Sequence, residues 1–234
     1  MPSLRPTLLP FTIERMDLLL LGNGKMNRLV AEVAAGQGHR VVKVITRGDR
    51  WAAGWAPELV AIDFSVAEAV VEHTDRCMAA GIPLVIGTTG WLDQLDAVRA
   101  LVDASHVGVV HGANFSIGVQ ALYRAVAAAA HALPTAYESF VWEAHHSQKR
   151  DAPSGTARHL AEQMRASGHD PGPIASTRAG WMPGTHTVGF DSPDDTLTIT
   201  HTARSRRGFA LGALTAAQWI LGKRGLHEFS EVIP

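Results

Sequence analysis

The segment Asp17-Leu18-Leu19-Leu20-Leu21-Gly22-Asn23-Gly24-Lys25-Met26-Asn27 runs from a short apolar strand pattern through a glycine turn into a helical pattern. Glycines permit a tight turn here, and the free N–H groups at a helix start suit a pyrophosphate. A third glycine usually allows close packing of helix and strand, but this chain has Asn27, which bears on that packing and on cofactor affinity. The segment predicts either a dinucleotide-binding turn or a plain strand-to-helix connection.

Short apolar runs and helical stretches alternate through the first half of the chain. The apolar runs are bounded by Gly, Pro or polar residues, as expected of parallel strands buried on both faces. They are 18–21, 41–45, 59–62, 84–86 and 107–110. The stretches long enough for crossover helices are 26–35, 66–80 and 91–102. This rhythm predicts an α/β fold with a Rossmann-like, doubly wound parallel sheet.

The pattern changes after Asn114. Residues 116–133 predict a long Ala-rich helix, 137–144 an alternating strand and 154–166 another helix. Two later runs of period two flank a Ser-Pro-Asp-Asp turn and predict a hairpin; they are 185–190 and 196–201. The second half is therefore expected to form a mixed, partly antiparallel sheet.

This change of pattern divides the chain into two expected domains. A dinucleotide-binding domain is expected at 16–113, and an α+β domain for substrate binding and oligomerisation at 114–208. The apolar C-terminal helical segment, within 209–234, is expected to pack back on the first domain. Residues 1–15 are interpreted as an extension, since they contain three prolines and no long apolar run.

Composition excludes several classes of protein. Lys and Arg number 21 against 22 Asp and Glu, so the formal charge of −1 gives no basis for nucleic-acid binding. No apolar stretch reaches the roughly 18 residues that span a bilayer, so no membrane partner is expected. Cys77 is the one cysteine, which excludes a disulfide framework and fits a reducing compartment. Without a secretory pattern, the expected location is cytoplasmic.

The end of the second predicted strand bears on the choice of cofactor. An acidic residue there bonds the adenosine 2′-hydroxyl of NADH, whereas a basic residue favours the 2′-phosphate of NADPH. The chain has Thr46 and Arg47 at this place, and a guanidinium pairs well with phosphate. We therefore expect NADPH. NADH stays possible, because Arg47 can be a solvated loop residue and Asp49 can serve a ribose.

Ionisable residues concentrate where the predicted strand 137–144 leads into the next helix. The run reads Glu143-Ala144-His145-His146-Ser147-Gln148-Lys149-Arg150-Asp151-Ala152-Pro153-Ser154-Gly155-Thr156-Ala157. A histidine here can donate a proton near neutral pH, as general acid catalysis requires. Ser154 or Thr156 is the expected helix cap. The N–H groups of Gly155 and Thr156 suit a substrate carboxylate, and Lys149 supplies a matching charge.

Three other interpretations of this run stay open. The paired histidines can be ordinary polar residues at a strand end, and Lys149 can be a surface charge. His145, His146 and Asp151 can also bind a metal ion, although adjacent residues on a strand project to opposite faces. The combination of histidine, lysine and an anion-binding helix start, in a chain with a dinucleotide turn, favours a catalytic site without metal.

The same run resembles the dihydrodipicolinate reductase family, now named 4-hydroxy-tetrahydrodipicolinate reductase. The family signature is matched at every fixed position by Glu143-x-His145-His146-x-x-Lys149-x-Asp151-Ala152-Pro153-Ser154-Gly155-Thr156-Ala157. Five further segments match in the family's order, at 62–65, 85–91, 113–119, 184–188 and 201–213. The resemblance extends from about Asp17 to the C-terminus.

The resemblance implies roles for individual residues. His145 matches the proposed general acid, and Lys149 matches its catalytic partner. The matched substrate-binding positions are His146, Ser154, Gly155 and Thr156. The matched cofactor-binding positions are Gly22, Asn23, Gly24, Lys25, Met26, Arg47, Gly87, Thr88, Thr89, Gly112, Ala113, Asn114 and Phe115.

The resemblance also implies a reaction, which belongs to the diaminopimelate route of lysine biosynthesis. A nicotinamide delivers a hydride to C4 of a small cyclic dicarboxylate, and the 4-hydroxyl of this substrate leaves as water. His145 then protonates the electron-rich intermediate. Lys149 and the helix start hold the carboxylates and offset developing negative charge.

An oligomer and two rival functions complete the expectations. Family members usually form homotetramers through the sheet of the second domain. Either such an interface or an internal core would account for the apolar alternation of Val188, Phe190, Leu197 and Ile199. One rival is a non-catalytic NADPH-binding sensor, in which the proton donor and carboxylate site would be broken. The other is a hydrolase that uses the metal-binding set named above.

Overall fold

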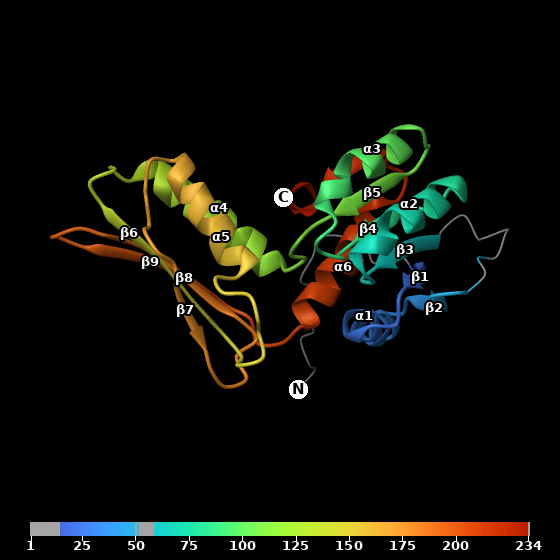
Figure 1. The fold of residues 1–234 in the computed structure, drawn as a ribbon, viewed down its shortest axis with the longest axis horizontal. Helices are drawn as coiled ribbons and strands as arrows, with labels where there is room; N and C mark the ends of the chain where they lie inside the picture. Colours follow the sequence, from blue (N-terminus) through green and yellow to red (C-terminus); the bar gives the residue numbers. More distant parts are fainter. Residues whose placement is uncertain (1–14, 50, 52–58, 234) are drawn as a thin grey trace, which may run out of the picture.

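The chain forms two β-sheets, each with its own helices, that lie beside one another (Figure 1). The computed structural model describes residues 15–49, 51 and 59–233. Most of the predicted extension, residues 1–14, lies outside the described residues. Among the described residues, no helix is long and apolar enough to cross a membrane.

The first sheet has six strands in the order β10-β5-β4-β3-β1-β2, and every neighbouring pair is parallel. Its strands are β1 (Asp17–Leu21), β2 (Arg40–Ile45), β3 (Leu59–Asp63), β4 (Leu84–Ile86), β5 (Gly108–His111) and β10 (Gly225–Glu228). The predicted doubly wound parallel sheet is confirmed.

Helices cover both faces of this sheet, which explains the unbroken leucine run of β1. Leu18 and Leu20 face a core shared with α1 (Lys25–Gly36) and α6 (Arg207–Ile220). Leu19 and Leu21 face the opposite core, shared with two other helices. These are α2 (Val70–Ala79) and α3 (Leu95–Asp103), which follow the short turns η1 (Ala67–Ala69) and η2 (Leu92–Gln94). A strand buried on both faces needs apolar side chains at every position.

The C-terminal helix α6 packs against α1 and the first sheet. Its buried side chains are mostly small, including Ala210, Ala213 and Ala217, and this allows a close approach. Gly212 is needed here, because a Cβ at this position would lie 1.8 Å from the carbonyl oxygen of Phe115. The helix therefore braces the segment through which the chain enters the second sheet.

The second sheet has four strands in the order β7-β6-β8-β9. They are β6 (Glu138–His145), β7 (Ala175–Arg178), β8 (Thr185–Asp191) and β9 (Thr196–Thr202). The β6–β7 pair is parallel, whereas β6–β8 and β8–β9 are antiparallel, so the predicted mixed sheet and hairpin are confirmed. Helices α4 (Ile117–Ala132) and α5 (Gly155–Ala166) lie on one face of the sheet (Figure 1).

The apolar alternation of the hairpin serves the internal core. Val188 and Phe190 are fully buried under α4 and α5, and Ile199 packs against the same cluster. Leu197 remains 41% exposed. The opposite face of the sheet carries the exposed rings of Phe140 and Trp142, which lie on alternate positions of β6.

Three short elements were not predicted from the sequence: β7, β10 and α7 (Phe229–Val232). The four residues of β7 are Ala-Ser-Thr-Arg, and those of β10 are Gly-Leu-His-Glu, so neither has an apolar pattern. Both strands lie at a sheet edge and are held by main-chain pairing to one neighbour.

Candidate active site

Asn27 lies where a dinucleotide-binding turn usually has its third glycine, and its side chain bonds to the glycine turn after β1. Gly22 has a φ of +95°, which favours glycine. The Asn27 side chain is 1% exposed and donates from Nδ2 to the carbonyl oxygens of Leu21 (2.6 Å) and Gly22 (2.8 Å). Asn27 therefore ties helix α1 to the end of β1, where a glycine would leave a gap.

The start of α1 fits a phosphate group. Gly24 is the N-cap residue, and no side chain accepts a hydrogen bond from the first turn. Asn23, Gly24 and Lys25 are exposed, while Met26 is half-buried. Free N–H groups at a helix start, beside a lysine, are the donors that a pyrophosphate requires.

The segment that follows β2 carries the arginine predicted to contact the cofactor. Arg47 lies there and is exposed. Asp49 accepts from the main-chain N–H of Thr46 at 2.6 Å and from its Oγ1 at 2.7 Å, and these bonds lower the pKa of the Asp49 carboxyl. The carboxylate is thus engaged within its own turn, beside a guanidinium that remains exposed.

A buried carboxylate organises the turn after β4. Asp63 is fully buried, and its Oδ1 accepts from the main-chain N–H of Ser65 (2.8 Å) and from Oγ1 of Thr88 (2.9 Å). Its Oδ2 lies 2.8 Å from Nδ1 of His73. The Thr88 hydroxyl therefore points into the protein, whereas Thr89 is exposed.

Gly87 lies in the same turn and packs so closely against the Phe64 ring that a side chain would not fit there. A Cβ at this position would lie 2.1 Å from the Phe64 side chain. Phe64 in turn packs edge-on against Phe115, at a centroid distance of 6.0 Å. The turns that follow β3, β4 and β5 are thus packed against one another at the carboxyl end of the sheet, where open α/β sheets bind ligands.

The segment after β5 joins the two sheets. The Phe115 ring is 2% exposed and stacks near Phe229 (4.5 Å between centroids), so it anchors the segment in the core. Gly112 and Ala113 precede it and are more exposed. Nδ2 of Asn114 donates to Oγ1 of Thr156 at 3.1 Å. This bond connects the predicted cofactor-binding segment to the start of α5.

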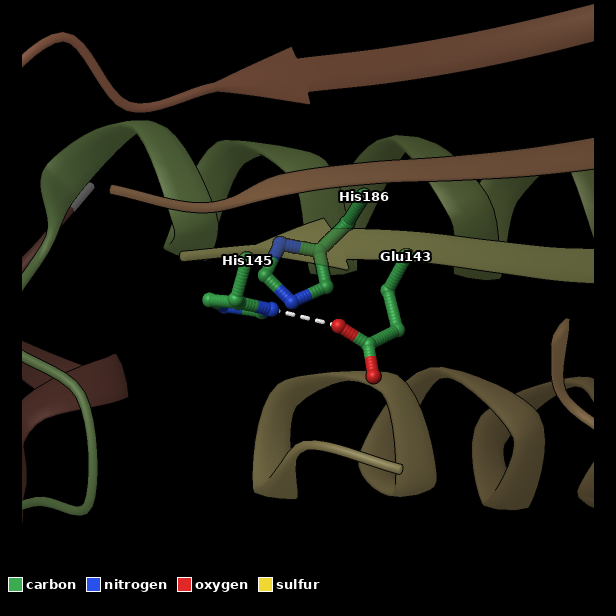
Figure 2. A group of neighbouring side chains, drawn as sticks. All are labelled: Glu143, His145 and His186. Atoms are coloured by element: carbon green, nitrogen blue, oxygen red, sulfur yellow. Dashed lines mark hydrogen bonds and ion pairs between the residues drawn. The ribbon is translucent and has the colours of Figure 1, made fainter. Parts of the chain in front are cut away.

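The predicted proton donor is held by a buried carboxylate on the same strand. His145 and Glu143 lie two residues apart on β6, and Nδ1 of His145 forms a hydrogen bond with Oε2 of Glu143 (Figure 2). His186 of β8 lies opposite Glu143 in the sheet register. Its ring packs edge-on against that of His145, with 5.1 Å between the ring centroids. The three side chains converge on the face of the sheet that carries α5.

Arg178 of β7 completes this cluster. It donates to both carboxylate oxygens of Glu143, at 2.9 and 2.7 Å. Burial raises the pKa of Glu143, but hydrogen bonds from Arg178, Ser176 and His145 outweigh it, and the pKa falls to about 2. Burial lowers the pKa of His145 below its usual value, and lowers that of His186 to about 4.

The predicted catalytic lysine lies on the loop that follows β6. Nζ of Lys149 is 2.8 and 3.0 Å from the two carboxylate oxygens of Asp151. Burial raises the pKa of Asp151, but the hydrogen bond from Lys149 outweighs it and the net shift is downward. His146 is half-buried, and its main-chain N–H donates to the carbonyl of Met182 at 2.8 Å. The loop is therefore pinned to the segment that leads into β8.

The start of α5 has the features of an anion-binding helix N-terminus. Oγ of Ser154 accepts from the N–H of Ala157 at 3.2 Å, which confirms Ser154 as the helix cap. The same oxygen lies 3.0 Å from Nε2 of His186. Gly155 is exposed and Thr156 is half-buried. Their N–H groups belong to the first turn of α5, a helix of 12 residues. Such a start favours a carboxylate.

The cluster does not fit a metal ion. Glu143, His145 and His186 place ligand atoms within 4.8 Å of one another. However, the carboxylate already pairs with the Arg178 guanidinium, whose charge opposes a second cation. Asp151, one of the ligands considered from the sequence, pairs with Lys149 instead. The metal-dependent hydrolase has no support in this geometry.

Three functional candidates were missed from the sequence. Glu143 was part of the quoted run but received no role, and His186 lay in a matched segment without one. Arg178 lies on β7, whose sequence has no strand pattern. Its contact with Glu143 spans 35 residues of sequence, so no local signal identifies the pair.

Two family models together match nearly the whole described chain. "Dihydrodipicolinate reductase, N-terminus" matches residues 16–115, and "Dihydrodipicolinate reductase, C-terminus" matches residues 118–233. The chain is 35% identical to a protein of Christiangramia forsetii named 4-hydroxy-tetrahydrodipicolinate reductase, over 93% of this chain and 98% of that protein. A protein of the same name from Natronomonas pharaonis is 40% identical, over 74% and 76% of the two chains.

Solved structures show the same fold. A dipicolinate-bound dihydrodipicolinate reductase from Paenisporosarcina sp. TG-14 superposes with a TM-score of 0.77 at 21% identity, over 94% of this chain and all of that chain. A diaminopimelate dehydrogenase of C. glutamicum superposes with a TM-score of 0.58 at 11% identity, over 94% of both chains. On the two family models and the curated relatives, the chain belongs to the family of 4-hydroxy-tetrahydrodipicolinate reductases.

Proposed function

We propose that the chain reduces 4-hydroxy-tetrahydrodipicolinate to tetrahydrodipicolinate with a nicotinamide cofactor, in the diaminopimelate route of lysine biosynthesis. Apart from family membership, the observation that carries this proposal is the hydrogen bond between Asn114 and Thr156, at 3.1 Å. It places the segment expected to line the nicotinamide next to the helix start expected to hold the substrate. Hydride transfer requires this juxtaposition of cofactor and substrate.

The N-terminus of α5 and Lys149 would hold the substrate carboxylates. The N–H groups of Gly155 and Thr156 lie at the helix start, where the helix dipole favours negative charge. Ser154 keeps this start in place as its cap. His146 lies on the loop between the general acid and Lys149, from where it would contact the same substrate.

His145 would donate the proton. A bound nicotinamide supplies the hydride, and the protein supplies orientation, charge and a proton. Since Nδ1 of His145 is engaged by Glu143, the proton would leave from Nε2. The buried carboxylate favours the imidazolium, while Lys149 offsets negative charge on the substrate side.

The residues of the first domain fit a dinucleotide. The Gly22 to Met26 turn and the open start of α1 would hold the pyrophosphate. Arg47 would pair with the 2′-phosphate of NADPH, and we therefore propose a preference for NADPH over NADH. Exposed Thr89 and Ala113, with the partly exposed Gly87, Gly112 and Asn114, would line the nicotinamide, whereas the buried Thr88 would hold their turn in place through Asp63.

The uncovered face of the second sheet is the proposed tetramer interface. Phe140 and Trp142 are 41% and 37% exposed there. Threonines of β8 and β9 surround them, with hydroxyl pairs such as Thr187–Thr200 at 2.9 Å. A sheet face of threonines and aromatic rings suits a sheet-to-sheet contact between copies of the chain. The proposed location is cytoplasmic.

The test is the initial rate of nicotinamide oxidation, followed by loss of absorbance. The substrate is made in situ from pyruvate and aspartate semialdehyde by the preceding enzyme, and NADPH is compared with NADH. Substrate-dependent oxidation is the expected result. A folded protein that binds NADPH but oxidises neither cofactor would be the sensor considered from the sequence, and the proposal would fail.

A further inference from the structure

We infer that Glu143 and Arg178 act together as positioning residues for His145, an inference that rests on the proposed function. The Glu143 side chain is fully buried and pairs with the Arg178 guanidinium. Oε2 accepts from His145 and Arg178, while Oε1 accepts from Arg178 and from the main-chain N–H of Ser154 at 3.3 Å. The carboxylate thus links the proton donor to the cap of α5.

The pair determines which nitrogen of His145 exchanges the proton. An ionised carboxylate only accepts hydrogen bonds, so Nδ1 of His145 carries a hydrogen and Nε2 is left as the reactive atom. Gly184 packs beside Nε2, and a side chain there would displace the ring, because a Cβ would lie 2.8 Å from this nitrogen. The ring is therefore fixed in one tautomer, with Nε2 as the nitrogen that Glu143 does not engage.

Arg178 determines where the carboxylate lies. It comes from β7, where it stands opposite His145 in the parallel register. Besides its two bonds to Glu143, it donates to the carbonyl oxygen of Asp151 at 2.6 Å. One guanidinium thus holds the carboxylate and the loop that carries Lys149. A lysine has the same charge but cannot reproduce this planar, forked geometry.

The charges around His145 predict opposite effects for the two partners. The groups that face it are Glu143 on its own strand, Arg178 on β7, His186 on β8 and Lys149 on the following loop. Removing the carboxylate leaves the imidazole among cations and should lower its pKa. Removing the guanidinium should raise it. A purely structural role would not produce shifts of opposite sign.

The experiment uses Glu143→Gln, Arg178→Gln and Arg178→Lys in the full-length protein. Glu138→Gln is the matched control for the carboxylate, because Glu138 is an exposed residue of the same strand. Arg165→Gln is the control for the arginines, because Arg165 forms an exposed pair with Asp170. Measurements are kcat, KM, the pH dependence of kcat/KM, NADPH affinity, thermal unfolding and the ¹⁵N NMR tautomer of His145.

We expect kcat to fall by about 10²-fold in Glu143→Gln and Arg178→Gln, with NADPH affinity unchanged. The basic limb of the pH profile should move to lower pH in Glu143→Gln and to higher pH in Arg178→Gln. Arg178→Lys should keep the wild-type limb and recover part of kcat. In wild-type protein NMR should show hydrogen on Nδ1 of His145, and Glu143→Gln should give mixed tautomers.

Several results would overturn the inference. One is a wild-type kcat and a wild-type pH profile in the variants. Another is a shift of the basic limb in the same direction in Glu143→Gln and Arg178→Gln. A third is a His145 tautomer that does not change in Glu143→Gln. If a variant fails to bind NADPH or to unfold cooperatively, two other measurements test the inference. They are the tautomer of His145 in the wild-type protein and the kinetics of Arg178→Lys. The NMR result is independent of turnover, so an inactive wild-type protein would refute the proposed function while the positioning role is still tested.

Discussion

Nδ2 of Asn114 donates to Oγ1 of Thr156 at 3.1 Å. This bond joins the segment that follows β5 of the first sheet to the first turn of α5, which lies on the second sheet. Asn114 is itself fixed, because its Oδ1 accepts from the N–H of Ser116 at 2.9 Å. The proposed cofactor-binding segment and the proposed substrate-binding helix start are thereby joined at one point. The relative placement of cofactor and substrate should depend on this bond.

A double-mutant cycle measures that dependence. Asn114→Ala and Thr156→Val should each lower kcat/KM by about 10-fold, and the double variant should lose little more, because both remove the same bond. Thr156→Ser keeps the hydroxyl and serves as the control. Fully additive losses would show that the two residues act separately.

His145→Gln should lower kcat by about 10² to 10⁴-fold, since it removes the proton donor. NADPH affinity should stay unchanged. Lys149→Ala should lower kcat and raise KM, because the lysine would contact a substrate carboxylate. His131→Gln, on the exposed end of α4, is the control for both. Wild-type turnover in His145→Gln would remove His145 from the proton-transfer step.

Arg47→Ala should weaken NADPH binding by about 10-fold or more and change NADH binding little, because only NADPH carries the 2′-phosphate. Dissociation constants from cofactor fluorescence titrations measure the difference. Arg165→Ala, at an exposed pair away from β2, is the control. Equal losses for the two cofactors would show that Arg47 does not contact the phosphate.

Asn27→Ala should lower the free energy of unfolding by about 1–3 kcal/mol, because the buried carbonyl of Leu21 loses its donor. NADPH affinity should fall too, since the turn is no longer tied to α1. Urea unfolding and cofactor titration check the two effects. Asn23→Ala, at an exposed position of the same turn, should change stability by less than about 0.5 kcal/mol.

Stability should fall as the pH drops below about 6.5, in part because of His186. Burial lowers its pKa to about 4 in the folded state, so between these two values the unfolded chain binds a proton that the folded chain does not. The loss from this one group is about 2 kcal/mol between pH 7 and pH 5. His186→Gln should lessen the pH dependence in urea unfolding. An unchanged slope, as expected of the exposed control His131→Gln, would contradict this.

Much of the fold follows from local patterns. The apolar run of β1, the glycine turn that follows it and the alternating runs of β8 and β9 are each local sequence signals, and all three form as predicted. Edge strands β7 and β10 carry none, because main-chain pairing rather than side-chain burial holds them. A pattern of side chains predicts only those elements that side-chain burial creates.

The candidate site divides in the same way. Residues close together in sequence, from Glu143 to Thr156, were recognised as a group because strand end, loop and helix start follow one another along the chain. The sequence did not predict the orientation of individual side chains. Thr88 and Phe115 belong to segments expected to contact the cofactor, yet the hydroxyl of one bonds to Asp63 and the ring of the other lies in the core.

The sequence alone therefore predicted the parallel sheet and the family, which are confirmed, and it supplied the proposals of a phosphate turn and a proton donor, since each rests on neighbouring residues. The partnership of Glu143 with Arg178 and His186 emerged only from the folded chain. Those contacts depend on strand register, which places residues of β6, β7 and β8 side by side, although Arg178 is 35 positions and His186 is 43 positions from Glu143 in the sequence. Hydrogen bonds and charge act over a few ångströms in space, irrespective of separation along the chain.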